Sequence, residues 1–433
     1  MISTLDINQK RLSTPPNFEP NTPEFDVITL QLNDQGELKD KQSLNAILQH
    51  IKNAREKNSS GVIVTLFAHG WHHGGDWDDS HFISFRNLLV SLCLREAERY
   101  RGPNSRGRRV IGVYLAWDGD PDDSWLAAMP GLTYLTFWDR YKTAKRLGSG
   151  TDLYEIVRSL IQATKSPLEE SASNARPHVI SPLILAGHSM GAILVELAFL
   201  SLLKQNDAAL LDNRQKGENE VIDLKRNGEA ILAPDLVLAL NSAADSEIAV
   251  EIKEMLEQQR WQKVAEALGG GIRYNPSVLL SITSRKDRDT GRIWRYAKPG
   301  RITEGHDSRL FTHTFTKLHA TSCDPRGPID FGQSWHCVRR PEPAVAASPS
   351  FYIDLPIGSR IKGEPLKHMR YRLCSIADDN RENLAWIFQI PGELSKNHND
   401  IFNPQMGSLV LALIQISGAV MSLANEWVET FEA

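Results

Sequence analysis

The chain alternates between short apolar runs and longer stretches in which apolar residues recur every three or four positions. The short runs are rich in β-branched residues, as in strands, whereas the longer spacing is typical of helices with one buried face. This alternation predicts an α/β fold with a mostly parallel sheet that helices cover on both faces. Strands are expected at 25–32, 62–67, 110–115, 183–186, 236–240, 278–283 and 384–390, and helices near 44–57, 82–94, 152–164, 193–200 and 405–430.

Breaks in this pattern predict the domain organisation. Residues 1–24 are polar and contain prolines, so we expect an arm on the surface. Residues 25–433 are expected to form one α/β domain with three insertions. The insertion at about 118–150 is apolar and lid-like, and the one at 206–230 is a polar surface excursion. The one at 290–380 is large and irregular, contains a proline-rich piece, and is a candidate for a lid or a small subdomain.

The most aromatic stretch of the chain lies in the first insertion. Residues 125–138 read WLAAMPGLTYLTFW and follow a predicted strand. Loops after the carboxyl ends of strands face the ligand site in open α/β sheets. We therefore expect Trp125, Met129, Phe137 and Trp138 to line a substrate pocket. An ordinary core helix explains the same pattern equally well, because periodicity does not separate the two.

Composition excludes some classes of function. The net charge of −4 results from 49 basic and 53 acidic residues, with no long basic stripe, so no nucleic-acid partner is expected. No window reaches the roughly 18 apolar residues of a membrane span. The closest, 409–424, contains Gln415 and Ser417 and is interpreted as a buried helix.

The cysteines and the N-terminal residues bear on location. Four cysteines in 433 residues do not indicate a disulfide framework. The first residues lack a charged region followed by an apolar run, so no Sec signal peptide is expected. A cytoplasmic, reducing location is the default expectation, and export by a route that needs no signal peptide is the alternative.

The clearest motif is Gly187-His188-Ser189-Met190-Gly191, here called the GHSMG turn. It joins an apolar, strand-like run to a helix-like stretch, which is the context of a nucleophile elbow. Such a turn strains the backbone of its serine, and glycines let the strand and the helix pack closely. The N–H groups and the positive dipole end of the helix then point at the serine oxygen. The alternative is a small-residue turn that only packs a helix on a sheet.

A serine hydroxyl needs three further parts to act as a nucleophile. An imidazole takes its proton, a carboxylate orients that imidazole, and hydrogen-bond donors hold the developing oxyanion. His398 is the only histidine between the last predicted strand and the closing helix. Asp287 follows strand 278–283 by a few residues and is the preferred acid, with Asp289 and Asp245 as alternatives.

These motifs, with His69-Gly70-Trp71 after strand 62–67, resemble those of the α/β-hydrolase superfamily of serine esterases and lipases. The order Ser…Asp…His is that of the superfamily, and the resemblance covers about 25–290 and 380–430. It implies that Ser189 is the nucleophile, Asp287 the acid and His398 the base. It also implies that the amides of Met190 and Trp71 form the oxyanion hole. Supporting roles fall to His69, Gly70, Gly187, His188 and Gly191.

Two groups of residues have metal-ligating side chains. The first comprises His72, His73, Asp76, Asp78 and Asp79, and the second comprises His319, Cys323, His336 and Cys337. Neither group has the ligand spacing of a zinc site. We therefore expect no metal and no organic cofactor.

The resemblance implies a serine hydrolase that cleaves carboxylic esters: a lipase, an esterase or a phospholipase. The aromatic stretch favours an apolar acyl group, so the expected partners are a small-molecule or lipid ester and, transiently, a lipid surface. The same residues would also serve a thioesterase, an amidase or an acyltransferase. Two further alternatives are an inactive binding scaffold and an antibacterial lipase effector that is exported without a signal peptide.

Overall fold

The computed structural model describes most of the chain and divides it into two compact units, Met1–Ala186 and Gly187–Ala433. The described ranges are 25–58, 60–99, 107–119, 133–165, 181–215, 233–257, 278–294, 301–318, 350–357, 367–376 and 384–417. The expected arm at 1–24 and the pocket candidates Trp125 and Met129 lie outside these ranges.

Seven strands form a mostly parallel sheet, as the apolar runs predict. Their order is β1-β3-β2-β4-β5-β6-β10, and the pairs β1–β3, β2–β3, β5–β6 and β6–β10 are all parallel. The strands are β1 Phe25–Gln31, β2 Val62–Ala68, β3 Arg109–Ala116, β4 Leu183–His188, β5 Leu236–Leu240, β6 Leu279–Ser284 and β10 Ala385–Ile390. The unit boundary falls within β4. All residues of β2, β4, β5 and β6 are buried, which is why these strands lack polar alternation.

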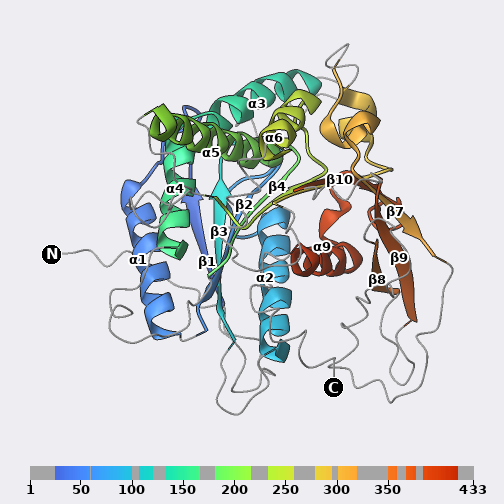
Figure 1. Cartoon of the computed structure of the whole chain (residues 1–433), viewed down its shortest axis with the longest axis horizontal. Helices are drawn as coiled ribbons and strands as arrows, with labels where there is room; N and C mark the ends of the chain where they lie inside the picture. The colour runs from blue at the N-terminus through green and yellow to red at the C-terminus, as the bar shows by residue number, and fades with distance from the viewer. Residues whose placement is uncertain are drawn as a thin grey trace. The chain divides into compact units, whose positions relative to one another are not determined.

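In the first unit, helices cover both faces of the strands. α1 (Lys41–Lys57) packs against α4 (Thr151–Lys165) on one side of β1 and β3, and α2 (Ser80–Arg99) lies on the other side (Figure 1). α3 (Thr133–Gly148) precedes α4. A Cβ at Gly112 would lie 2.3 Å from Leu89 Cδ1, so the glycine allows α2 to approach β3 closely.

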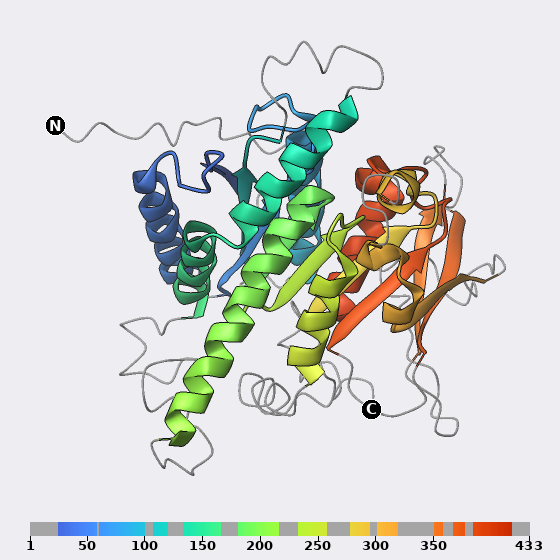
Figure 2. The same ribbon diagram turned by 90° about the horizontal axis from the view of Figure 1, so that it is seen from above.

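In the second unit, α5 (Met190–Gln215) and α6 (Ser246–Glu257) run side by side (Figure 2). They lie on one side of β10, and α9 (Pro404–Ile416) lies on the other (Figure 1). α5 continues through residues 206–215, so the first ten residues of the predicted surface excursion at 206–230 are helical. α6 is not predicted, although its buried residues Ile248, Ala249, Ile252 and Leu256 follow helical spacing.

The insertion at 290–380 contains a second, antiparallel sheet. Its strands are β7 (His313–Lys317), β8 (Ser350–Ile357) and β9 (Lys367–Ser375), in the order β7-β9-β8. The expectation of an irregular insertion is therefore wrong for these segments. They escape a search for continuous apolar runs because apolar and polar residues alternate along them. For example, Tyr371 and Leu373 are buried whereas Arg372 between them is exposed.

Within the described ranges, no helix is both long and apolar enough to cross a membrane.

Candidate functional site

The GHSMG turn connects β4 to α5, and its backbone is in an unusual conformation. Ser189 has φ 56°, the left-handed region that non-glycine residues rarely adopt. A Cβ at Gly187 would lie 2.4 Å from the Gly191 carbonyl oxygen and 2.6 Å from the Ala192 nitrogen, so only glycine fits there. The predicted strand, tight turn and helix are thus present in the structure.

Backbone hydrogen bonds fix Ser189 at the end of β4. Its N–H donates to the Leu240 carbonyl at 3.0 Å, and its carbonyl accepts from the Ala243 N–H at 3.1 Å. α5 begins at the next residue, Met190, so the N–H groups of the first helical turn and the positive end of the helix dipole lie next to Ser189. A negative charge that develops beside Ser189 would be stabilised there.

The predicted base and acid of the second unit lie in direct contact. His398 Nδ1 is 3.0 Å from Asp287 Oδ2, and both residues are buried. Asp287 lies just beyond β6, at the start of the π-helix η2 (Asp289–Ile293). Its Oδ1 accepts from the N–H groups of Asp289 and Thr290, and its Oδ2 accepts from the Thr290 hydroxyl. These hydrogen bonds replace those that water would make to the carboxylate, and they stabilise its charge in the buried site.

This arrangement separates the pKa values of the two groups. Burial would raise the pKa of Asp287, but the charge and hydrogen bond of His398 and the Thr290 hydrogen bonds lower it to about 2. For His398, burial would lower the pKa, but the charge and hydrogen bond of Asp287 and the charge of Asp289 raise it above its usual value. Because ionised Asp287 can only accept a hydrogen bond, Nδ1 of His398 carries the proton, and Nε2 of the neutral ring has a free lone pair.

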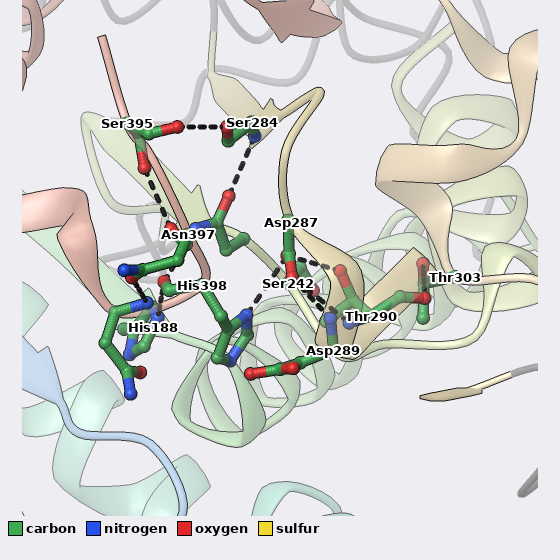
Figure 3. A network of polar contacts seen from close by, with 12 residues as sticks. His188, Ser242, Ser284, Asp287, Asp289, Thr290, Thr303, Ser395, Asn397 and His398 are labelled. Carbon is green, nitrogen blue, oxygen red and sulfur yellow. Dashed lines mark hydrogen bonds and ion pairs between the residues drawn. The ribbon is translucent and has the colours of Figure 1, made fainter. Parts of the chain in front are cut away.

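Hydrogen bonds hold the backbone of His398 as well as its ring. Its carbonyl oxygen accepts from Asn241 Nδ2 at 2.7 Å and from His188 Nε2 at 3.0 Å. The His188 and His398 rings lie 4.8 Å apart, so the residue before Ser189 packs on the predicted base. Figure 3 shows the ring of His398 between His188 and Asp287. The sequence motifs do not point to Asn241. In the sequence, the feature that could have identified Asn241 is its place as a polar residue directly after a buried strand. In the structure its φ is 43°, in the left-handed region.

The two alternative acids lie in different surroundings. Asp289 is exposed, and its carboxyl group points toward the ring of His398 (Figure 3). Asp245 is buried, with Oδ2 3.7 Å from Arg301 Nη1. Of the three aspartates, Asp287 makes the hydrogen bond to His398.

The predicted oxyanion turn belongs to the first unit. His69 is fully buried, its Nδ1 donates to the Gly70 carbonyl at 2.9 Å, and its Nε2 accepts from the Trp117 N–H at 3.1 Å. Burial lowers the pKa of His69 to about 4, so the ring is neutral and its hydrogen bonds hold the turn. Whether this turn serves an oxyanion hole, with His69 as its support, stays a prediction. His72, which follows Trp71, has φ 62°.

Trp71 lies in a group of aromatic side chains. Its ring stacks on His72, with centroids 3.9 Å apart, and meets the edge of Phe137 at 5.5 Å. Phe137 in turn contacts Trp138 and Tyr141 on α3. Two of the four predicted pocket residues therefore group with Trp71, and whether they line a substrate pocket stays a prediction.

One of the two metal candidates lies within the described residues. His73 Nδ1 is 3.0 Å from Asp79 Oδ2, and Asp79 also accepts from the N–H groups of His81 and Phe82 at the start of α2. Asp79 thus acts as a helix cap. Across the described ranges, no group of three or more His, Cys, Asp or Glu residues is arranged to hold a metal ion. His319, Cys323, His336 and Cys337 lie outside those ranges.

No match was found between this chain and models of known protein families, curated proteins or solved structures. The functional interpretation therefore depends on the residues and on the geometry described above.

A buried pair of two carboxyl groups also lies in the second unit. Glu196 on α5 and Glu304 in the 3-10 helix η3 (Glu304–His306) are both fully buried, and their carboxyl groups interact electrostatically. Ser242 donates to Glu196 and Ser281 donates to Glu304. Burial raises the pKa of both groups, and the negative charge of Glu304 raises the pKa of Glu196 further. The folded chain therefore keeps a proton on this pair at pH values where the unfolded chain has lost it.

We expect Glu196→Gln to reduce the pH dependence of stability. In the wild type, this pair's contribution is fully present below about pH 4.5 and declines as pH rises toward the raised folded pKa, by up to about 1.4 kcal/mol per pH unit. The glutamine side chain needs no proton, so the variant should gain stability relative to the wild type between about pH 5 and 8. Urea unfolding across this range measures the effect, with Glu254→Gln, at an exposed position of α6, as the control. Parallel curves for wild type and Glu196→Gln would contradict the shared proton.

Proposed function

We propose that the chain is a serine hydrolase of the α/β-hydrolase type that cleaves carboxylic esters through an acyl-enzyme intermediate. The observation that carries this proposal is the buried Asp287–His398 pair, whose base packs on the residue before Ser189. Ser189 itself has a left-handed backbone at the start of a helix. In this proposal Ser189 is the nucleophile, His398 the base and Asp287 the acid.

The proposed reaction proceeds in two halves. Ser189 Oγ attacks the ester carbonyl carbon while its proton moves to His398 Nε2. The tetrahedral intermediate then expels the alcohol, which takes that proton, and leaves the acyl group on Ser189. Water repeats the sequence, giving its proton to Nε2, and releases the carboxylic acid with a neutral His398 and an intact Ser189. Asp287 stays ionised throughout and stabilises the imidazolium.

Backbone amides are proposed to hold the oxyanion. The Met190 N–H, at the start of α5, is one donor, and the Trp71 N–H is proposed as the second. Loss of one such donor generally costs about 3–4 kcal/mol of transition-state stabilisation. Because these donors belong to the backbone, side-chain substitutions at Trp71 should weaken the activity without abolishing it.

The proposed substrate class is an ester with an apolar acyl group, such as a lipid, and binding would involve transient contact with a lipid surface. The support is the aromatic group of Trp71, Phe137 and Trp138, together with the apolar sequence at 125–138. A lipase, esterase or phospholipase fits this better than a hydrolase of small polar esters.

The proposal is tested by a fluorophosphonate probe and a panel of acyl substrates. We expect covalent labelling at Ser189 and turnover of nitrophenyl esters that increases with acyl chain length. Faster turnover of thioesters or of amides would identify a thioesterase or an amidase. Transfer products formed with an added alcohol would identify an acyltransferase. Treatment with a chelator should leave the turnover unchanged. A folded wild type that neither reacts with the probe nor turns over any ester would refute the proposal and favour a binding scaffold.

A further inference from the structure

The carbonyl oxygen of His398 joins three loops of the second unit. His188 belongs to the GHSMG turn and donates to this oxygen at 3.0 Å, and Asn241 follows β5 and donates to it at 2.7 Å. The Asn241 Oδ1 accepts from the Ser284 N–H at 2.9 Å, three residues before Asp287. One carbonyl group thus connects the turn of Ser189, the loop of Asp287 and the loop of His398.

We propose that Asn241 and His188 are positioning residues that set the place of His398 between Ser189 and Asp287. This inference rests on the proposed function, because it assigns these residues to the same site. Asn241 and His188 act through the backbone carbonyl of His398, whereas the Asp287 carboxylate acts through the ring of His398.

An asparagine suits position 241 for two physical reasons. Its φ of 43° lies in the left-handed region, which Asn tolerates better than most residues. Its amide also donates to His398 and accepts from Ser284 at the same time, and both partners are buried backbone groups. Aspartate has the same shape but cannot donate to a carbonyl oxygen. Glycine fits the backbone but makes neither bond.

The hydrogen bond of His188 defines its protonation. A carbonyl oxygen only accepts, so Nε2 of His188 carries a proton and donates it to His398. The His188 ring is also packed between the His398 ring at 4.8 Å and Phe402 at 6.5 Å. Glutamine can present an N–H donor at a similar reach, whereas phenylalanine keeps the ring but lacks the donor. The pair His188→Gln and His188→Phe therefore separates the hydrogen bond from the packing.

Loss of either donor should let the His398 loop shift. The loop keeps other anchors, among them the Ser284 hydroxyl, which donates to the Ser395 carbonyl at 2.6 Å, three residues before the base. A displacement of about 1 Å in a catalytic group can cost about 100-fold in rate. Because these hydrogen bonds act on the base, we expect the loss in kcat, with little change in KM.

The experiment measures the rate of fluorophosphonate labelling and the kinetics of ester hydrolysis in full-length variants. We expect His188→Phe, Asn241→Gly and Asn241→Asp to lower the labelling rate and kcat about 10- to 100-fold, with KM within about threefold. His188→Gln should restore most of the wild-type rate. The control His313→Phe removes another buried histidine of this unit, whose ring packs on Trp386, and should leave the labelling rate unchanged.

Equal rates for His188→Gln and His188→Phe, or a wild-type rate in Asn241→Gly, would overturn the positioning role. A second readout keeps this test separate from the proposed function. The Nδ1 proton of His398, held by buried Asp287, should give an exchange-protected NMR signal that is absent in His398→Gln. We expect that signal to persist in His188→Gln and to be lost in His188→Phe and Asn241→Gly, even if the wild type shows no activity. An unchanged signal in both of the latter variants would refute the inference by itself.

Discussion

Ser189→Ala is expected to abolish ester turnover and fluorophosphonate labelling while leaving the melting temperature close to that of the wild type. The substitution removes one oxygen atom from a residue that is 6% exposed. The hydrogen bonds that hold this position, to Leu240 and from Ala243, use only backbone atoms and are retained. Loss of the nucleophile from a complete triad typically costs on the order of 10⁶ in kcat.

The matched control for this variant is Ser242→Ala. Ser242 is buried in the same unit, and its hydroxyl donates to Glu196 and accepts from the Ala244 N–H. We therefore expect the opposite result, with loss of stability of about 1–3 kcal/mol and retention of labelling. Thermal unfolding and probe labelling of the two variants, side by side, measure both effects. Turnover that persists in purified Ser189→Ala would require another nucleophile.

Much of this site could be predicted from the sequence because the fold organises it in a simple way. Buried parallel strands produce continuous apolar runs, and the polar residues that follow such runs lie at the carboxyl edge of the sheet. Asp287 and His398 were identified by this reasoning, and the structure brings their side chains to 3.0 Å. The crowding at Gly187 likewise explains the glycine of the motif.

The remaining features depend on tertiary contacts that leave little trace in the sequence. Asn241 and His188 bind a backbone carbonyl, and any residue at position 398 would provide one. Glu196 appears within an apolar helix, and its partner Glu304 is 108 positions away in the chain. The antiparallel strands of the large insertion alternate in polarity over only five to nine residues, so a search for long apolar runs does not detect them.

Asp287→Asn is expected to lower kcat about 10⁴-fold, although it preserves shape and volume. The N–H groups of Asp289 and Thr290 both donate to Oδ1 of Asp287, so an asparagine would keep its oxygen toward them. Its amide nitrogen would then face His398 Nδ1 as a donor. Nδ1 would have to accept, the ring proton would move to Nε2, and His398 could no longer take the proton of the nucleophile.

The same substitution at Asp289 should instead shift the pH profile. Activity requires neutral His398, so it rises with pH through the raised pKa of this residue. The charge of Asp289 helps to raise the pKa of His398. Asp289→Asn should therefore move the acid limb of kcat/KM to lower pH and leave the plateau within a few-fold of the wild type. Asp245→Asn weakens a contact with Arg301 and should mainly affect stability. Profiles of kcat/KM from pH 5 to 9 for the three variants decide the assignment. A greater loss in Asp289→Asn or Asp245→Asn than in Asp287→Asn would transfer the role of the acid to that residue.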